Sequence, residues 1–290
     1  MKSAPEPSLW MRALSRVPLW AWYPFASFVA FLAWRVFPYR RHVVEGNLKA
    51  SFPQWDDGTR ERVIRDYYRG FADVFVEVAR SLRLTPDEVR ERVKIRNPEL
   101  VREVSQGKPV LLMAAHQCNW EWLLLGFSTQ LGLPVDAVYK PLVNPWADQA
   151  MFALRSRLGA RPVVAEHLLT DILKNRNVQR GIAIIADQEP VSSERKHWLT
   201  FLNRDSAFFL GAEEITRTVR YATVFSRIRR VSRGHYEVEF VPLSAAGEKM
   251  ETGEFTARYA RLVEEQIRAA PADWPWSHKR WKLKKPLYGA

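Results

Sequence analysis

Four short apolar runs alternate with helical segments in the middle of the chain, and this alternation restricts the fold more than any other feature of the sequence. The runs cover residues 110–114, 135–139, 162–165 and 182–186, and the helical segments between them lie near 120–131, 145–158 and 168–176. Strands that alternate with helices predict an α/β fold in which most strands are parallel. Because no repeat and no Gly/Ser linker interrupts the chain, we expect a single mixed, largely parallel sheet flanked by helices.

The segments on either side of this core carry their own signals. Residues 59–82 place apolar side chains at spacings of three and four, which predicts an amphipathic helix. The stretch Thr85-Pro86-Asp87-Glu88 has the pattern of a capping box, so a short helix should begin there. Residues 223–229 and 235–241 alternate like the strands of a hairpin, and 255–270 predict a last helix.

The 290-residue chain has a formal net charge of +12. A surplus of this size predicts an acidic partner, which is nucleic acid, an anionic membrane surface or an acidic protein. We find no nucleic-acid-binding motif, and an apolar N-terminal segment argues against that partner. Cys118 is the single cysteine, which excludes an intramolecular disulfide, and no second Cys/His pair accompanies it to predict a metal site.

The N-terminal region contains an uncharged stretch at residues 17–34, with the sequence VPLWAWYPFASFVAFLAW. About 20 apolar residues are usual for a membrane-spanning helix, and Pro18 and Pro24 weaken a straight helix here. The alternatives are a signal peptide, a buried helix of the globular domain, and a membrane anchor that spans the bilayer or lies in its interface. Flanking arginines favour the anchor, so we expect a hydrophobic membrane-anchor helix within residues 1–40 and a second domain over 41–290.

His116 and Glu121 form the most informative pair of the sequence. The stretch PVLLMAAHQCNWEW runs from a predicted buried strand into His116, and Glu121 follows where a helix opens. Ligands of open α/β sheets bind at the carboxyl ends of the strands, which is where this places His116. Five residues of regular helix turn the chain by about 500°, so His116 should lie in the turn and Glu121 should reach back to it. A neutral histidine oriented by a carboxylate is a general base, although this spacing also occurs by chance around structural histidines.

This motif and four further blocks resemble a known family. His116-x4-Glu121 after an apolar strand resembles the histidine/acid motif of the glycerolipid-type acyltransferases. The blocks resemble one branch, the late (lauroyl/myristoyl-type) acyltransferases of lipid A biosynthesis, and they are RRHVVEGNLKASFP (40–53), AVYKPLVNPWAD (137–148), AIIADQEP (183–190) and DWPWSHKRWK (273–282). Because they run in order over most of the chain, the joint resemblance is far more specific than any one block, and it favours the catalytic interpretation of His116.

The resemblance implies an O-acyltransferase, with residues 41–290 as its acyltransferase domain. It implies transfer of a fatty acyl chain from acyl carrier protein to a hydroxyl of a lipid A-type glycolipid, at the cytoplasmic face of a bacterial inner membrane. No cofactor and no metal are expected. His116 would be the general base and Glu121 its orienting partner. The acceptor hydroxyl would attack the thioester directly, without a covalent enzyme intermediate.

The same comparison suggests which residues bind substrate: Asn119, Trp120, Lys140, Asp187, Gln188 and Arg280. Lys140, or backbone amides at the helix start, would donate hydrogen bonds to the oxyanion. Asp187 and Gln188 follow a predicted strand, so they should lie on the same edge of the sheet as His116. Arg280 belongs to the basic segment 279–285, which predicts a site for lipid phosphate or headgroup, with an ordinary solvated face as the alternative.

Some alternatives remain open. Cys118 stands where relatives often carry glycine, so it has a rival interpretation as an acyl-enzyme nucleophile paired with His116, although a small, partly buried thiol is the simpler one. The acceptor is open among a lipid A precursor, another glycolipid, a lysophospholipid and an aminolipid. A non-enzymatic basic protein that binds membranes or nucleic acid is the alternative from another class.

Overall fold

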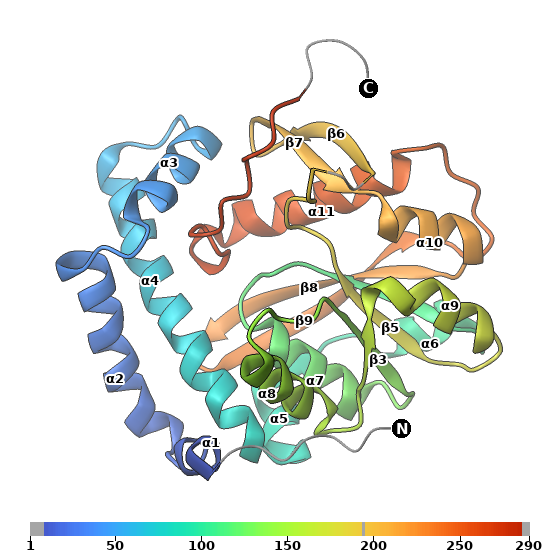
Figure 1. Ribbon diagram of the computed structural model, residues 1–290, viewed down its shortest axis with the longest axis horizontal. Helices are drawn as coiled ribbons and strands as arrows, with labels where there is room; N and C mark the ends of the chain where they lie inside the picture. Colours follow the sequence, from blue (N-terminus) through green and yellow to red (C-terminus); the bar gives the residue numbers. More distant parts are fainter. Residues whose placement is uncertain (1–8, 193–194, 286–290) are drawn as a thin grey trace.

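A seven-stranded sheet forms the centre of the computed structural model, which describes residues 9–192 and 195–285 (Figure 1). Its strand order is β1-β9-β8-β2-β5-β3-β4, and all neighbouring strands are parallel except the antiparallel pair β8 and β9. The strands are β1 (Val93–Ile95), β2 (Val110–Ala114), β3 (Val135–Tyr139), β4 (Arg161–Val164), β5 (Gly181–Ile185), β8 (Thr223–Ser232) and β9 (His235–Ser244). The expected α/β class and the largely parallel sheet are therefore confirmed.

The helices occupy most of the segments that the sequence predicts. They are α1 (Leu9–Leu14), α2 (Leu19–Phe31), α3 (Arg41–Ser51), α4 (Asp57–Arg80), α5 (Pro86–Arg92), α6 (Glu99–Ser105), α7 (Trp120–Gln130), α8 (Pro145–Ser156), α9 (Leu168–Lys174), α10 (Gly211–Val219) and α11 (Glu254–Ala269). The capping box at the start of α5 is present, with Thr85 and Glu88 bonded to each other's backbone.

Alternate residues of the central strands face two separate cores. Leu111 and Met113 of β2 pack in one core with Val263 of α11, whereas Leu112 and Ala114 pack in the other with Leu123 and other residues of α7. Figure 1 shows α10 and α11 on one side of the sheet and α5 and α7 on the other. Strands buried on both faces explain why the sequence shows continuous apolar runs there.

Besides the helices α1 and α3, two features of the β structure are absent from the sequence-based prediction. One is the edge strand β1, which has three residues and pairs with β9. The other is a separate antiparallel hairpin of β6 (Lys196–Phe201) and β7 (Arg204–Phe209). Its two-residue turn, Leu202-Asn203, has positive φ at both positions without a glycine, so the usual sequence signal of such a turn is missing.

The N-terminal helix α2 packs along α4 instead of standing alone. Its buried residues Leu19, Ala26 and Ala30 recur at spacings of seven and four and face the body of the protein. Five residues of π-helix, η1 (Leu32–Val36), continue it. Within the described part of the chain, no helix has the length and apolar character needed to cross a bilayer. A spanning anchor therefore has no support, and the outer ends of the expected domains, residues 1–8 and 286–290, lie outside the description.

Candidate active site

His116 and Asp187 lie side by side because their strands end in register. Ala114, the last residue of β2, pairs with Ile185, the last residue of β5, and each site residue follows two positions later. The Nδ1 atom of His116 lies 2.6 Å from Oδ1 of Asp187, and the backbone N–H of His116 donates to Oδ2 at 3.1 Å. His116 thus meets the aspartate through both its ring and its backbone.

Asp187 is buried and surrounded by donors. The indole N–H of Trp274 donates to its Oδ2 atom at 2.9 Å, and Nε of Arg280 donates to its backbone carbonyl at 2.7 Å. Burial by itself raises the pKa of this carboxyl, but the facing His116 ring and the hydrogen bonds from His116 and Trp274 outweigh it and lower the pKa. The carboxylate is therefore ionised at neutral pH and accepts the Nδ1–H of His116.

The other ring nitrogen of His116 is consequently the one free to accept a proton. With Nδ1 protonated, Nε2 carries the lone pair, and the side-chain amide nitrogen of Gln188 lies 3.4 Å from it. The ring of Trp120 meets the imidazole edge to face, with centroids 5.1 Å apart. About a fifth of the His116 side chain remains exposed, so a substrate hydroxyl can reach it.

Glu121 does not orient His116, and this corrects the prediction. Its carboxylate forms two hydrogen bonds with Arg155 of α8, at 3.0 Å from Nε and 2.6 Å from Nη2, and a third with the indole of Trp120 at 3.1 Å. The first turn of α7 directs Glu121 across to α8, whereas the in-register ends of β2 and β5 bring Asp187 to His116. Glu121 therefore lies in the same site as His116, but its role there is to bind Arg155.

An apolar pocket adjoins this ion pair. Its lining residues come from the ends of β2, β3 and β5 and from α7 and α8, and they are Ala114, Trp120, Glu121, Leu123, Leu124, Phe127, Ala137, Val138, Ala183, Ile184, Ile185 and Arg155. A wider hollow lies between β8, β9 and α11, but it is lined by none of the candidate site residues. The pocket beside Glu121 combines apolar walls with the charged groups of Glu121 and Arg155, and it shares Trp120 with the surroundings of His116.

Two of the expected substrate-binding residues are enclosed in the protein. Asn119 is fully buried, and its side chain caps α7 by accepting from the N–H of Trp122 at 3.0 Å. Arg280 is also fully buried, with its guanidinium carbon 4.6 Å from the ring centre of Phe208, and burial lowers its pKa to about 10. Both side chains support the site from behind, although the neighbouring Lys279, Lys282, Lys284 and Lys285 are exposed.

Lys140 immediately follows β3, so it lies on the same edge of the sheet as His116. Its ammonium group lies 5.6 Å from the ring centre of Phe209, a cation–π contact, and the residue is exposed. A contact between Lys140 and the oxyanion therefore stays a prediction.

Cys118 occupies a backbone conformation that favours glycine. Its φ is +53°, and its N–H donates to the carbonyl of Asp273 at 2.9 Å. The thiol is 2% exposed, and burial together with the nearby Asp273 raises its pKa well above the usual value. A buried thiol with a raised pKa is a poor nucleophile.

Sequence reasoning missed Arg155 and Trp274 as parts of the site. The sequence signal for a residue such as Arg155 was Glu121, because a buried carboxylate needs a positively charged or hydrogen-bonding partner. Trp274 lies in the block 273–282, which carried the family resemblance but gave no role to this tryptophan. Among the described residues, no group of three or more His, Cys, Asp or Glu side chains is placed to bind a metal ion.

The chain is similar to known proteins over most of its length. Residues 8–283 match the family model described as bacterial lipid A biosynthesis acyltransferase. A lipid A biosynthesis acyltransferase of Haemophilus influenzae is 22% identical over 82% of this chain and 74% of its own length. A lipid A biosynthesis palmitoleoyltransferase of Escherichia coli is 21% identical over 96% of this chain and 93% of its own.

Proposed function

Because this chain belongs to the bacterial lipid A biosynthesis acyltransferase family and is an O-acyltransferase, we propose that it acylates a hydroxyl of a lipid A-type glycolipid precursor, with an acyl carrier protein thioester as the donor. The observation that carries this proposal is the His116–Asp187 contact, which leaves Nε2 of a partly exposed imidazole to accept a proton. Another glycolipid, a lysophospholipid or an aminolipid is the alternative acceptor.

The chemistry follows from the tautomer. Nε2 of His116 takes the proton of the acceptor hydroxyl while the oxygen attacks the thioester carbonyl, and Asp187 stabilises the resulting imidazolium. The tetrahedral intermediate collapses, the carbon–sulfur bond breaks, and the imidazolium returns the proton to the departing thiolate. The products are an ester and a free carrier thiol. The burial and raised pKa of Cys118 support this direct route over an acyl-enzyme.

The apolar pocket beside Glu121 has a volume of about 60 Å³, which suits only a short part of the donor's fatty acyl chain, so we place the end of the chain next to the thioester there. Its walls are mostly aliphatic and aromatic, and they begin at the strand ends that carry His116. Arg155 lies at this pocket and is placed by Glu121, so it offers a positive charge to the oxyanion or to an anionic part of the donor. In this proposal Glu121 acts on the reaction through Arg155.

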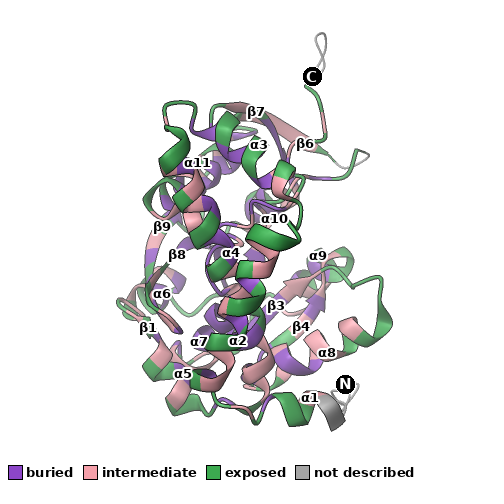
Figure 2. Ribbon diagram, turned by 90° about the vertical axis from the view of Figure 1, so that its left-hand side faces the viewer, coloured by how far each residue is buried: buried purple, intermediate pink, exposed green. Residues whose placement is uncertain are grey.

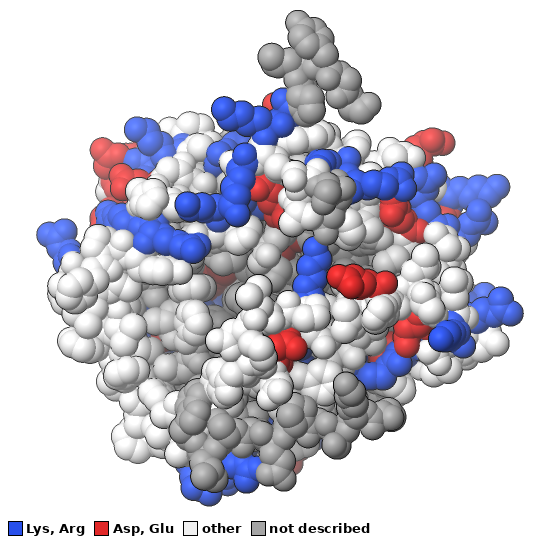
Figure 3. Space-filling view, in the orientation of Figure 1, with Lys and Arg blue, Asp and Glu red and all other residues white. Residues whose placement is uncertain are grey.

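The outward face of α2 suits a membrane interface. Trp20, Phe28 and Phe31 lie on the side opposite the buried residues and are 78%, 59% and 49% exposed. Figure 2, which looks onto this side, shows exposed residues in front of the buried core, and Figure 3 shows few charged atoms over α2 and α4, with Lys and Arg gathered along the upper edge. Aromatic side chains bordered by basic residues bind the headgroup layer of anionic bilayers, which fits the cytoplasmic face of a bacterial inner membrane.

The substrate proposal is tested by incubating the purified protein with acyl carrier thioester and extracted lipid A precursor and identifying the products by mass spectrometry. A product one acyl chain heavier supports it. Acylation of lysophospholipid or aminolipid alone identifies the alternative acceptors. Acyl-coenzyme A should be the poorer donor at low salt, with the difference shrinking as salt screens the basic surface.

The membrane proposal is tested by flotation with anionic vesicles. Changing Trp20 and Phe28 together to glutamate should release the protein, because both side chains are exposed and neither supports the core. Unchanged flotation of this variant would contradict the assignment of α2 as the membrane-binding face.

A further inference from the structure

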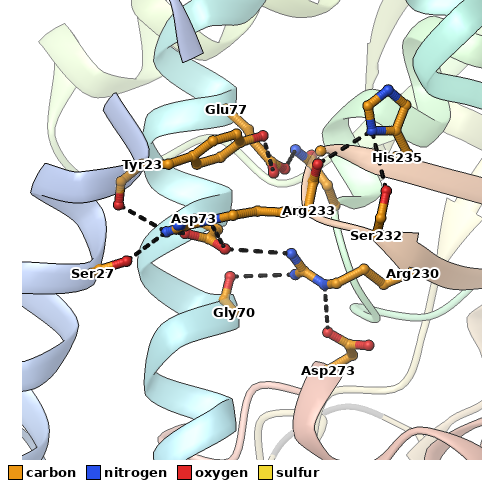
Figure 4. A network of polar contacts seen from close by, with 12 residues as sticks. Tyr23, Ser27, Gly70, Asp73, Glu77, Arg230, Ser232, Arg233, His235 and Asp273 are labelled. Carbon is orange, nitrogen blue, oxygen red and sulfur yellow. Dashed lines mark hydrogen bonds and ion pairs between the residues drawn. The ribbon is translucent and has the colours of Figure 1, made fainter. Parts of the chain in front are cut away.

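Glu77 of α4 is a buried carboxylate that joins three separate elements. Its Oε1 atom accepts from the hydroxyl of Tyr23 on α2 at 3.1 Å (Figure 4). Its Oε2 atom accepts from the side-chain amide of Asn119 at 2.9 Å and from the hydroxyl of Tyr236 on β9 at 2.6 Å. The side chain is fully buried, so these three donors take the place of water. One carboxylate thus connects the N-terminal helix to the turn that carries His116.

Asn119 transfers this connection to the start of α7. Its Oδ1 atom caps the helix by accepting from the N–H of Trp122, while its Nδ2 atom donates to Glu77. A reversed amide would point its NH2 group at the Trp122 N–H, so Glu77 selects the orientation that caps α7. The indole N–H of Trp122 also donates to the backbone carbonyl of Glu77 at 3.1 Å. The start of α7 is therefore fastened to α4 at two points.

The position of this helix start matters for the chemistry. His116, Cys118 and Asn119 form the short turn between β2 and α7, and the first turn of α7 carries Glu121. Cys118 adopts positive φ in that turn, a conformation that the surroundings must maintain. Displacement of Asn119 would therefore move His116 relative to the acceptor and Glu121 relative to Arg155.

A second set of contacts attaches α2 and reaches the catalytic turn by a longer route, from Arg233 through Asp73, Arg230 and Asp273 to the N–H of Cys118. Arg233 of the β8–β9 turn donates through Nη2 to the carbonyl of Tyr23 and to Oγ of Ser27, each at 2.9 Å (Figure 4). The same guanidinium forms an ion pair with Asp73 of α4 at 2.5 Å. Ser27 belongs to the same helix as Tyr23, and its hydroxyl does not touch Glu77. Its loss leaves the Arg233–Asp73 ion pair and the contact of Arg233 with the Tyr23 carbonyl in place, so Ser27 is a matched control.

We infer that Glu77 is a positioning residue for acyl transfer and that α2, through the Tyr23 hydroxyl, helps to fix the catalytic turn. The inference rests on the proposed function for its activity measurement. It makes the N-terminal helix part of the catalytic apparatus as well as a surface for the membrane. Loss of the Tyr23 hydroxyl should therefore lower turnover even where membrane binding is not required.

The test compares Tyr23→Phe with Ser27→Ala in detergent micelles that contain both substrates. Tyr23→Phe should lower kcat about tenfold with little change in KM, because one buried hydrogen bond is removed from the positioning chain. Ser27→Ala should keep kcat within about twofold of the unchanged enzyme. Equal effects of the two variants would mean that α2 contributes general stability only.

A double-mutant cycle separates positioning from stability. Asn119→Ser keeps a capping hydroxyl but is too short to donate to Glu77. If the chain runs from Tyr23 through Glu77 to Asn119, the Tyr23→Phe/Asn119→Ser double variant should be no slower than Asn119→Ser alone. Fully additive losses in kcat would overturn the inference.

Hydrogen exchange supplies a readout that needs no substrate. Backbone amides of residues 117–122 should exchange faster in Tyr23→Phe than in Ser27→Ala, while amides of α11 are the same in both variants. Equal exchange at 117–122 in the two variants would contradict the inference whatever the lipid substrate is. If the unchanged enzyme shows no transfer, that result counts against the proposed function. The hydrogen-exchange comparison of the two variants still decides the inference in that case.

Discussion

The imidazole of His116 and the carboxylate of Asp187 meet at 2.6 Å across 71 residues of sequence. This contact sets the tautomer of His116 and leaves its Nε2 atom on the side of Gln188. It also explains why two parallel strands must end in register for the site to form, because both residues lie two positions beyond their strands. The register of the sheet thus brings together His116 and Asp187, the residues that we propose as the general base and its partner.

Asp187→Asn should lower kcat by about 100-fold or more while the protein stays folded. An amide in place of the carboxylate neither stabilises the imidazolium nor imposes the Nδ1–H tautomer. Trp274→Phe removes one donor to the same carboxylate and should have a smaller effect. Steady-state rates and circular dichroism of both variants test this prediction. An Asp187→Asn enzyme with a normal rate would exclude the proposed role of Asp187 as the partner of His116.

The same pair should contribute to stability in a pH-dependent way. The pKa of Asp187 lies below its usual value, so its contribution is present above the unfolded-state pKa of about 4 and is lost as pH falls through the lowered folded-state pKa. The difference in Tm between the unchanged protein and Asp187→Asn should therefore be largest near neutral pH and shrink below about pH 4. A difference that grows on acidification would contradict the ionised state of Asp187.

Glu121 and Arg155 should behave as one unit. Arg155→Ala and Glu121→Ala should each reduce transfer strongly, and the double variant should be little worse than Arg155→Ala, because Glu121 acts by placing the guanidinium. Kinetics of the three variants with acyl carrier thioester decide this. If Glu121→Ala lowers the transfer rate as much in the Arg155→Ala variant as in the unchanged enzyme, Glu121 has its own contact with the reacting groups.

Cys118→Gly should be active and change the free energy of unfolding by no more than about 1 kcal/mol. Glycine adopts the positive φ of this position without strain, which offsets the loss of the buried thiol. Cys118→Val should be destabilised, because a β-branched side chain fits neither the conformation nor the space. Chemical denaturation of the two variants tests this, and an inactive but folded Cys118→Gly enzyme would favour the acyl-enzyme route.

The sequence predicted the sheet well because its strands are buried on both faces and its helices have strong apolar periodicity. It also placed Asp187 on the same edge of the sheet as His116. However, it assigned Asp187 to substrate binding and assigned the orientation of His116 to Glu121. Spacing along the chain describes only local geometry, whereas the His116 partner is decided by strand register and the Glu121 partner by the packing of α7 on α8. Contacts such as Tyr23–Glu77 depend on long-range packing and carry no local signal.

The uncharged stretch at residues 17–34 shows the same limit. Its composition predicted an anchor, but composition does not reveal that one side of α2 packs on α4. Arg280 is similar, since it sits among lysines in the sequence but folds inward behind Asp187. In both places a neighbour far away in sequence decides which side of the chain meets solvent.

The central claim, direct attack assisted by His116, is tested most directly by intact-protein mass spectrometry on the enzyme mixed with acyl carrier thioester. Without acceptor, the protein mass should remain unchanged. On addition of lipid A precursor, acylated lipid should form with the unchanged enzyme and be lost with His116→Ala. A protein heavier by one acyl chain before acceptor is added, or full activity of His116→Ala, would contradict the account.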